Sequence, residues 1–265
     1  MAIVKDFYNA VDRWAPFAIQ EGFDNAGFLV GRADAEVTRV LVALDITLPV
    51  IEEAEKLGAQ LIVSHHPVIF SPLKSVTADD YNGHRVLALA EKKIAAICAH
   101  TNLDAAQGGV NCCLAQRLDL TGIGQLHAEG TDEQGRAYGI GRVGLSHESG
   151  LSAEAYARFV KEKLGAASVR FADCGKPVEK VAVGGGSCAS MMADAIAAGC
   201  DTFVTADVKY DQYLQAKALG LNLMDAGHFA TENVISAPMV EYLRGEFPDV
   251  EIILSECHRE VYSGV

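Results

Sequence analysis

The sequence predicts an α/β protein with two related lobes, in which mostly parallel sheets are flanked by helices. First, short β-branched runs alternate with helical patterns, which is typical of βαβ units. Second, residues 57–66 and 198–207 align, with Gly and Val at the same places. The match indicates either two related lobes or only two similar helix–glycine–strand joints. Third, 50% of the 265 residues are hydrophobic, which is enough for an extensive core.

The first half of the chain is expected to form strands joined by helices. The expected strands are 40–45, 61–64 and 94–99, and the expected helices cover about 49–57 and about 110–118. Residues 122–149 are rich in Gly and polar residues and show weak periodicity, so they form either a β-rich excursion or a boundary between lobes.

The second half shows the same alternation more clearly. Residues 152–165 predict a helix with Ser152 as N-cap and Gly165 as stop signal. The expected strands that follow are 181–183, 202–205, 221–225 and 250–254, and the expected helices are 190–198, 209–219 and about 231–244.

Composition excludes several classes of protein. No apolar run approaches the roughly 20 residues of a membrane span, and the first residues lack the features of a signal peptide. We therefore expect a soluble cytoplasmic protein. The 35 acidic against 22 basic residues give a formal charge of −13, which disfavours binding to nucleic acid. The seven cysteines contain no C-x-x-C motif and are expected to be reduced, buried thiols.

Polar side chains follow several of the expected strands. His65 and His66 come after strand 61–64, and His100 and Asp104 come after strand 94–99. Asp207 follows strand 202–205, and His228 lies three residues beyond strand 221–225. Ligands of open α/β sheets gather beyond the carboxyl ends of strands. The pattern therefore indicates a site assembled from distant parts of the chain.

The donor types in this pattern suit a metal. His228 and Glu232 are four residues apart, so on a helix they share one face. His65 and His66 are adjacent, so they would face opposite sides of a strand but could reach two neighbouring ions at its end. Alternatively, they form a surface turn, the His228–Glu232 pair is a surface or capping pair, and Asp104 is a turn residue or N-cap. Imidazole and carboxylate donors suit zinc, iron, manganese or nickel better than calcium.

Two glycine-rich matches are interpreted structurally. Gly139-Ile-Gly141-Arg-Val-Gly144 fits a dinucleotide fingerprint, but no helix follows it. Gly184-Gly-Gly-Ser187 follows a strand, but it lacks the ending of a nucleotide-binding loop and is better explained as a close-packed turn.

Four motifs together resemble a known family. They are Asp24-Asn25-Ala-Gly27, Ser64-His-His-Pro67, His100-Thr-Asn-Leu-Asp104 and Asp225-Ala-Gly-His-Phe-Ala-Thr-Glu232. Their types and order resemble the dinuclear-metal-centre proteins called GTP cyclohydrolase 1 type 2 homologues, or NGG-one-interacting-factor-three-like proteins. The resemblance implies a single family domain over 1–265, with approximate lobes 1–124 plus 226–265, which bear the metal, and 125–225.

The resemblance also implies a toroidal homohexamer with two divalent ions per chain. By position, His65 and Asp104 would hold one ion, His66 and His228 the other, and Glu232 would bridge them. His100 would be a nearby group that either supports the metal ligands or transfers a proton. One departure is Asp211, because many members carry a histidine after the tyrosine that corresponds to Tyr210.

The resemblance leaves two functions open. The first is metal-dependent hydrolysis of a nucleotide-like or phosphate-bearing substrate, by attack of water on the guanine ring of GTP or on a phosphoester, with Glu232 and His100 as catalytic residues. The alternative is a non-catalytic metal-delivery protein or regulatory interaction scaffold. A third reading, DNA threaded through the ring, is disfavoured by the charge of −13.

Overall fold

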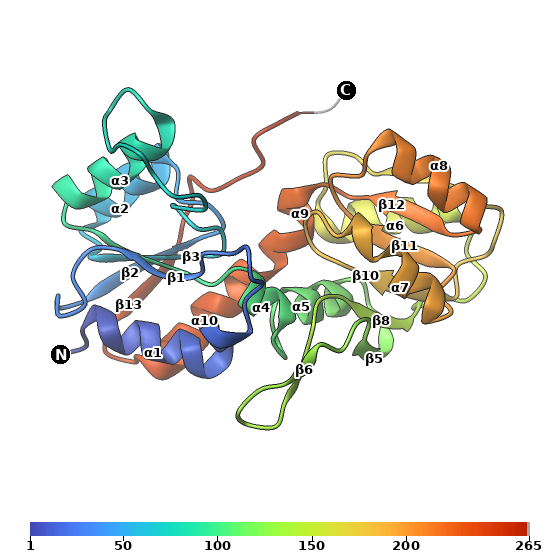
Figure 1. Ribbon diagram of the computed structural model, residues 1–265, viewed down its shortest axis with the longest axis horizontal. Coiled ribbons are helices and arrows are strands. Elements are labelled where there is room, and N and C mark those ends of the chain that lie inside the picture. Colours follow the sequence, from blue (N-terminus) through green and yellow to red (C-terminus); the bar gives the residue numbers. More distant parts are fainter. Residues whose placement is uncertain (264–265) are drawn as a thin grey trace. The chain divides into compact units, whose positions relative to one another are not determined.

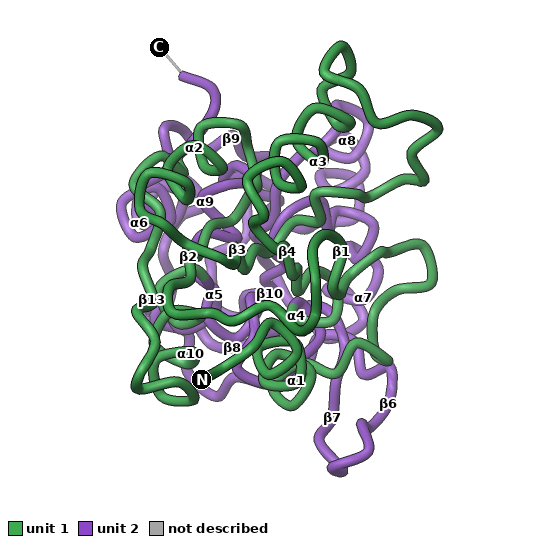
Figure 2. Tube along the Cα trace, turned by 90° about the vertical axis from the view of Figure 1, so that its left-hand side faces the viewer, with its two compact units in different colours: residues 1–103, 236–259 green, residues 104–235, 260–265 purple. Residues whose placement is uncertain are grey.

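A computed structural model describes residues 1–263, which form two compact units (Figure 2). The first unit comprises residues 1–103 and 236–259, and the second comprises residues 104–235 and 260–263. These bounds differ from the approximate lobes 1–124 plus 226–265 and 125–225. Residues 104–124 belong to the second unit because their helix and strand pack on its sheet.

The first unit is built on a five-stranded sheet. Its order is β1 (Gly27–Val30), β4 (Ala95–Cys98), β3 (Leu61–Ser64), β2 (Arg39–Ala43) and β13 (Glu251–Leu254). β4, β3, β2 and β13 are mutually parallel, and only the edge strand β1 runs antiparallel to its neighbour. The expected parallel sheet is therefore present in this unit.

Helices cover both faces of the first sheet (Figure 1). They are α2 (Leu48–Leu57) and α3 (Tyr81–Glu91) on one face, and α1 (Val4–Trp14) and α10 (Ser236–Glu246) on the other. Leu41 and Ile62 of the sheet pack with Val50 and Ile51 of α2 and with Leu89 of α3. Phe7 of α1 stacks on Phe247, with 3.9 Å between ring centroids. A short 3-10 helix, η1 (Phe17–Ile19), follows α1.

The second unit has a six-stranded sheet of mixed direction. Its order is β5 (Thr121–Gln125), β8 (Arg142–Leu145), β10 (Lys180–Val183), β11 (Thr202–Thr205), β12 (Asn222–Asp225) and β9 (Arg170–Ala172). Only the central strands β10, β11 and β12 are parallel. A small hairpin of β6 (Gly130–Thr131) and β7 (Ala137–Tyr138) lies between β5 and β8 in the chain. Residues 122–149 are therefore a β-rich excursion within this unit.

Alternation along the strands buries both faces of the second sheet. Val181 and Val204 pack in the cluster that contains residues of α5 (Val110–Arg117) and α6 (Ala153–Leu164). Ala182 and Phe203 pack in the cluster formed with α7 (Met192–Ala197) and α8 (Tyr210–Leu219). This unit is a sheet between two helical layers, which agrees with the α/β class predicted from the sequence.

Four neighbouring strands have the same relative directions in both sheets, which supports the alignment of residues 57–66 with 198–207. β3 lies between the parallel strands β2 and β4, and β11 lies between the parallel strands β10 and β12. In each sheet the next strand outward, β1 or β9, is antiparallel. The matched glycines, Gly58 and Gly199, both precede the central strand with a positive φ, of 68° and 74°.

The predicted last helix is interrupted. In place of one helix over about 231–244, the chain forms α9 (His228–Glu232), the 3-10 turn η3 (Asn233–Ile235) and then α10. Pro238 lies in the first turn of α10, where a missing N–H is tolerated. A further short helix, α4 (Thr101–Ala105), and a 3-10 turn, η2 (Ala189–Met191), complete the elements. Within residues 1–263, no helix is both long and apolar enough to cross a membrane.

Candidate metal centre

In the first unit, the adjacent histidines after β3 have different partners. His65 is fully buried, and its Nδ1 lies 2.8 Å from the carbonyl oxygen of Ala99. His66 is partly exposed, and its Nδ1 lies 2.8 Å from Oδ1 of Asp45, just beyond β2. Because a carbonyl oxygen can only accept, Nδ1 of His65 carries a proton, and a neutral His65 then has its lone pair on Nε2. Asp45 favours the same tautomer of His66.

His100 completes a group of three imidazoles in this unit. One nitrogen from each of His65, His66 and His100 lies within 4.8 Å of the others. Nδ1 of His100 lies 2.7 Å from Oδ1 of Asp24, whose Oδ2 accepts hydrogen bonds from the amide and hydroxyl of Thr101. The Asp24 of the D-N-x-G motif thus orients His100 and the start of α4.

The pKa of Asp24 reflects this position. Burial of the carboxyl raises its pKa, but hydrogen bonds from His100 and Thr101 and the charge of His100 lower it by more, to about 2. The side chain of Asp24 is fully excluded from solvent. It therefore remains a carboxylate at neutral pH and can accept the hydrogen bond from Nδ1 of His100.

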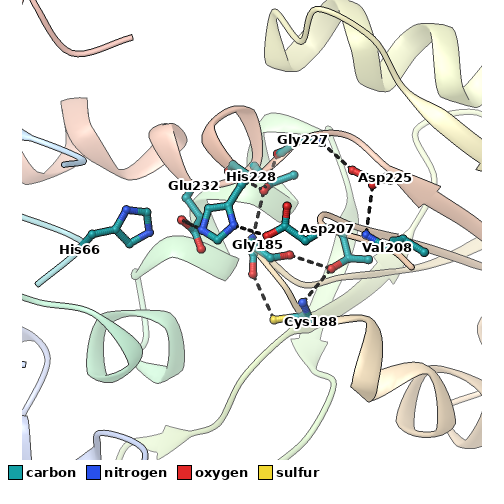
Figure 3. Close-up of polar contacts among 12 residues, drawn as sticks. His66, Gly185, Cys188, Asp207, Val208, Asp225, Gly227, His228 and Glu232 are labelled. Atoms are coloured by element: carbon teal, nitrogen blue, oxygen red, sulfur yellow. Dashed lines mark hydrogen bonds and ion pairs between the residues drawn. The ribbon is translucent and has the colours of Figure 1, made fainter. Parts of the chain in front are cut away.

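In the second unit, the four-residue spacing of His228 and Glu232 places both on one face of α9, as predicted. Nε2 of His228 lies 3.0 Å from Oε2 of Glu232, and its Nδ1 lies 2.6 Å from Oδ2 of Asp207 (Figure 3). With the proton on Nδ1, the lone pair of Nε2 would face the carboxylate of Glu232. An imidazole lone pair and a carboxylate repel each other, and a cation bound by both groups removes this repulsion. This donor set therefore fits a divalent metal ion.

Asp225 accepts hydrogen bonds from the two backbone segments that carry Asp207 and His228 (Figure 3). Its Oδ2 accepts a hydrogen bond from the amide of Val208, and its Oδ1 accepts one from the amide of Gly227, the N-cap of α9. Arg170 donates to the same carboxylate. Asp225 therefore fixes the loop that carries Asp207 and the turn that begins the His228 helix.

Asp104 lies in α4, where its side chain is buried. A carboxylate oxygen of Asp104 lies within 4.8 Å of one of Glu232. Both carboxylates also act on Cys188: burial of this thiol raises its pKa, and the charges of Asp104 and Glu232 raise it further. The second unit thus brings together three of the predicted site residues, which are Asp104, His228 and Glu232.

Other sequence features have structural explanations. The amides of Gly184, Gly185 and Gly186 donate to Val204, Asn111 and Thr231, so this loop is a close-packed turn whose donors are used internally. All seven cysteines are free; Cys98, Cys112 and Cys200 are buried, Cys257 is exposed, and the other three are partly buried. Asp211 is exposed in the first turn of α8.

One protein-family model matches nearly the whole chain. The model of the Duf34/NIF3 (NGG1p interacting factor 3) family matches residues 2–260. The chain belongs to this family. This agrees with the family indicated by the four sequence motifs.

Two relatives and one solved structure match most or all of the chain. The chain is 38% identical to the "GTP cyclohydrolase 1 type 2 homolog" of Streptomyces coelicolor, over 88% of this chain and 82% of that protein. It is 30% identical to the "GTP cyclohydrolase 1 type 2" of Helicobacter pylori, over 92% of each. The crystal structure of Staphylococcus aureus protein SA1388 superposes with a TM-score of 0.91 at 29% identity, covering 100% of this chain and 99% of that one.

Sequence reasoning identified the Duf34/NIF3 motifs but missed the groups that orient them. Asp45 was counted only as the end of an expected strand, and Asp207 only as a polar residue beyond one. The available signal was their place after β2 and β11, next to the strands that carry His66 and His228. A carboxylate at the end of a neighbouring strand is well placed to bind the Nδ1 of a histidine.

Proposed function

We propose that this Duf34/NIF3 protein holds two divalent metal ions and uses them to hydrolyse a nucleotide-like or phosphate-bearing substrate. The observation that carries the proposal is the common orientation of its histidines. Nδ1 of His65, His66, His100 and His228 each lies within hydrogen-bond distance of a carbonyl or carboxylate oxygen. Histidines held in this way offer Nε2 to a metal.

The proposed ligand sets follow the family motifs. His65 and Asp104 would hold one ion, His66 and His228 would hold the other, and Glu232 would bridge the two. The mixture of imidazole and carboxylate donors suits zinc, iron, manganese or nickel. Two divalent ions carry four positive charges against the two negative charges of Asp104 and Glu232, so the site would attract an anionic substrate despite the chain's charge of −13.

The chemistry would be divided between the metal and the chain. When bound, paired divalent ions lower the pKa of water and stabilise the charge that develops on the attacked group. His100, with Nδ1 held by Asp24, would accept and return a proton through Nε2. Asp45 and Asp207 would keep His66 and His228 in the tautomer that binds metal.

Hydrolysis can be tested with the protein reconstituted with each candidate metal. GTP and a generic phosphoester are offered separately, and the release of formate or phosphate is measured. We expect turnover that rises with metal occupancy and falls at least a hundredfold in Glu232→Gln. Equal rates in the wild type and Glu232→Gln would refute the assignment of Glu232.

The second candidate function is a non-catalytic one. The family description names an interaction with the protein NGG1p, which favours a metal-delivery or regulatory scaffold. Metal binding without turnover of any offered substrate, together with transfer of the metal to a competing apo-protein, would support this function over hydrolysis.

We also propose that the chain assembles as a homohexamer, as the family resemblance implies. Sedimentation equilibrium should then give a mass six times that of the 28.2-kDa chain. A mass of one or two chains at micromolar concentration would contradict this assembly.

A further inference from the structure

The glycine turn after β10 lies directly against the candidate ligand Glu232. Gly186 has a φ of +61°, and a Cβ placed on it would lie 2.1 Å from Oε1 of Glu232 and 3.2 Å from Cε1 of His228. A Cβ on Gly185 would lie 3.2 Å from Cγ of Glu232. The carboxylate of Glu232 therefore occupies its present position because Gly186 carries no side chain, and a Cβ there would displace it.

The buried side chain of Asn111 links this turn to the backbone of Asp104, the second candidate carboxylate ligand. Asn111 is fully excluded from solvent; its Oδ1 accepts from the amide of Gly185 at 2.9 Å, and its Nδ2 donates to the carbonyl oxygen of Asp104 at 3.0 Å. One side chain therefore links the backbone of Asp104 to the turn that backs Glu232. The amide both donates and accepts here, whereas an aspartate at neutral pH would have no donor and a leucine would have neither group.

The other side of the turn is held as firmly. The amide of Gly186 donates to Oγ1 of Thr231, the residue before Glu232, and the hydroxyl of Thr205 donates to the carbonyl oxygen of Gly186. Both polar groups of Gly186 are thus fixed by side chains that are buried. These hydrogen bonds hold the backbone of Gly186 in place. If a side chain were added at Gly186, the backbone could move away from Glu232 only by breaking them.

We infer that Gly186 and Asn111 are positioning residues that fix the carboxylates of Glu232 and Asp104 relative to each other for metal binding. Gly186 acts by leaving the space that the Glu232 carboxylate occupies, and Asn111 acts by joining the backbone of Asp104 to the same turn. This inference rests on the proposed function, since it takes these two carboxylates as metal ligands.

The first test compares two glycine substitutions with the same backbone conformation. Gly186→Ala and Gly165→Ala place an alanine at a φ of +61° and +63°, but nothing lies within 4 Å of a Cβ on Gly165. Both variants carry the same backbone strain, so a comparable loss of thermal stability is expected from that source. Only Gly186→Ala is expected to weaken Zn²⁺ or Mn²⁺ binding, by tenfold or more in a chelator competition titration. Equal affinities of the two variants would overturn the inference.

A double-mutant cycle shows whether the effect passes through Glu232. In a Glu232→Gln background, Gly186→Ala should cause a much smaller further loss of metal affinity than in the wild type. An undiminished loss would mean that Gly186 acts by another route. For Asn111, Asn111→Asp keeps the acceptor for Gly185 and removes the donor to Asp104, and it should weaken metal binding at least tenfold. Affinity equal to that of the wild type would remove Asn111 from the inference.

A second measurement needs no bound metal and separates this inference from the proposed function. In a crystal structure of metal-free Gly186→Ala, the carboxylate of Glu232 should have left its place 3.0 Å from Nε2 of His228. If the carboxylate is unmoved, Gly186 does not position it. If instead the wild type binds no metal while the carboxylate moves as expected, the proposed function fails and the positioning role of Gly186 stands.

Discussion

Nδ1 of His228 lies 2.6 Å from Oδ2 of Asp207, a residue with a φ of +53° at the end of β11. Such a backbone conformation is unfavourable for a residue with a side chain, but aspartate tolerates it better than most. The amide of the next residue, Val208, is held by Asp225. The chain therefore keeps an unfavourable conformation at the position from which the carboxylate of Asp207 orients His228.

This contact predicts that Asp207→Asn weakens metal binding. Asparagine keeps the shape of the side chain but loses the charge that makes His228 a stronger donor, so affinity for a divalent metal should fall about 10- to 100-fold. Asp211→Asn is the matched control, because Asp211 is an exposed aspartate in the first turn of the adjacent helix α8. Chelator competition measures both variants. If Asp207→Asn binds metal as tightly as Asp211→Asn, Asp207 does not support the site.

The lowered pKa of Asp24 predicts that its carboxylate contributes to stability in a pH-dependent way. Its folded pKa of about 2 lies below the value of about 3.9 in an unfolded chain, so the unfolded state binds the proton more readily. The carboxylate should then contribute about 2 kcal/mol above roughly pH 5, and this contribution is lost as the pH falls toward 2. The free energy of unfolding of the wild type should exceed that of Asp24→Asn at about pH 6, with a smaller difference near pH 2.5.

Urea denaturation at both pH values measures this difference. Asp249→Asn serves as the control, because Asp249 is exposed and lies before the edge strand β13. A wild-type advantage over Asp24→Asn that is the same at both pH values would contradict the assignment to the carboxylate.

The buried hydrogen bonds of Arg142 predict a large loss of stability when this residue is replaced. Its guanidinium is buried and donates to the carbonyl oxygens of Ala105, Ala106, Gly139 and Gly141, and its Nε donates to Sγ of Cys112. Arg142→Met would leave these buried carbonyl groups without donors, which should cost about 3 kcal/mol or more. Chemical denaturation measures this loss, with the exposed Arg117→Met as control. A loss as small as that of the control would show that water replaces the guanidinium.

Thiol reactivity should follow exposure and pKa. Burial raises the pKa of Cys98 to about 12 and raises that of Cys188 as well, whereas Cys257 is exposed. Because the thiolate is the reactive form, iodoacetamide at about pH 8 should modify Cys257 first and leave Cys98 and Cys188 intact in the folded protein. Peptide mass spectrometry identifies the modified positions. Early modification of Cys188 would show that its side of the second unit opens readily.

Much of the fold could be predicted because periodicity is a local property. β3, β11 and β12 are short segments with apolar residues at their centres and the length typical of buried strands, and each was expected within a residue or two of its observed bounds. The helix α1 was missed, although Val4, Phe7, Val11 and Trp14 follow the spacing of an amphipathic helix. The mixed direction of the second sheet could not be predicted, because the pairing of β9 and β8 with distant strands leaves no local pattern.

The residue types of the candidate site could be predicted from the sequence, but the residues that position its ligands could not. The spacing of His228 and Glu232 is a property of one helical turn, so their shared face follows from sequence alone. Gly186 was interpreted only as part of a close-packed turn, because its nearness to Glu232 depends on how β10 and α9 pack in the second unit. The link from Asn111 to Asp104 is likewise a tertiary contact without a local signature.

The central claim is that the chain binds two metal ions through the residues named above. Elemental analysis of metal per chain, on the wild type and on His66→Ala after saturation and removal of free metal, tests it most directly. We predict close to two ions per chain in the wild type and close to one in His66→Ala. No bound metal in the wild type, even after addition of zinc, iron, manganese or nickel, would contradict the claim and leave the interaction scaffold as the function to pursue.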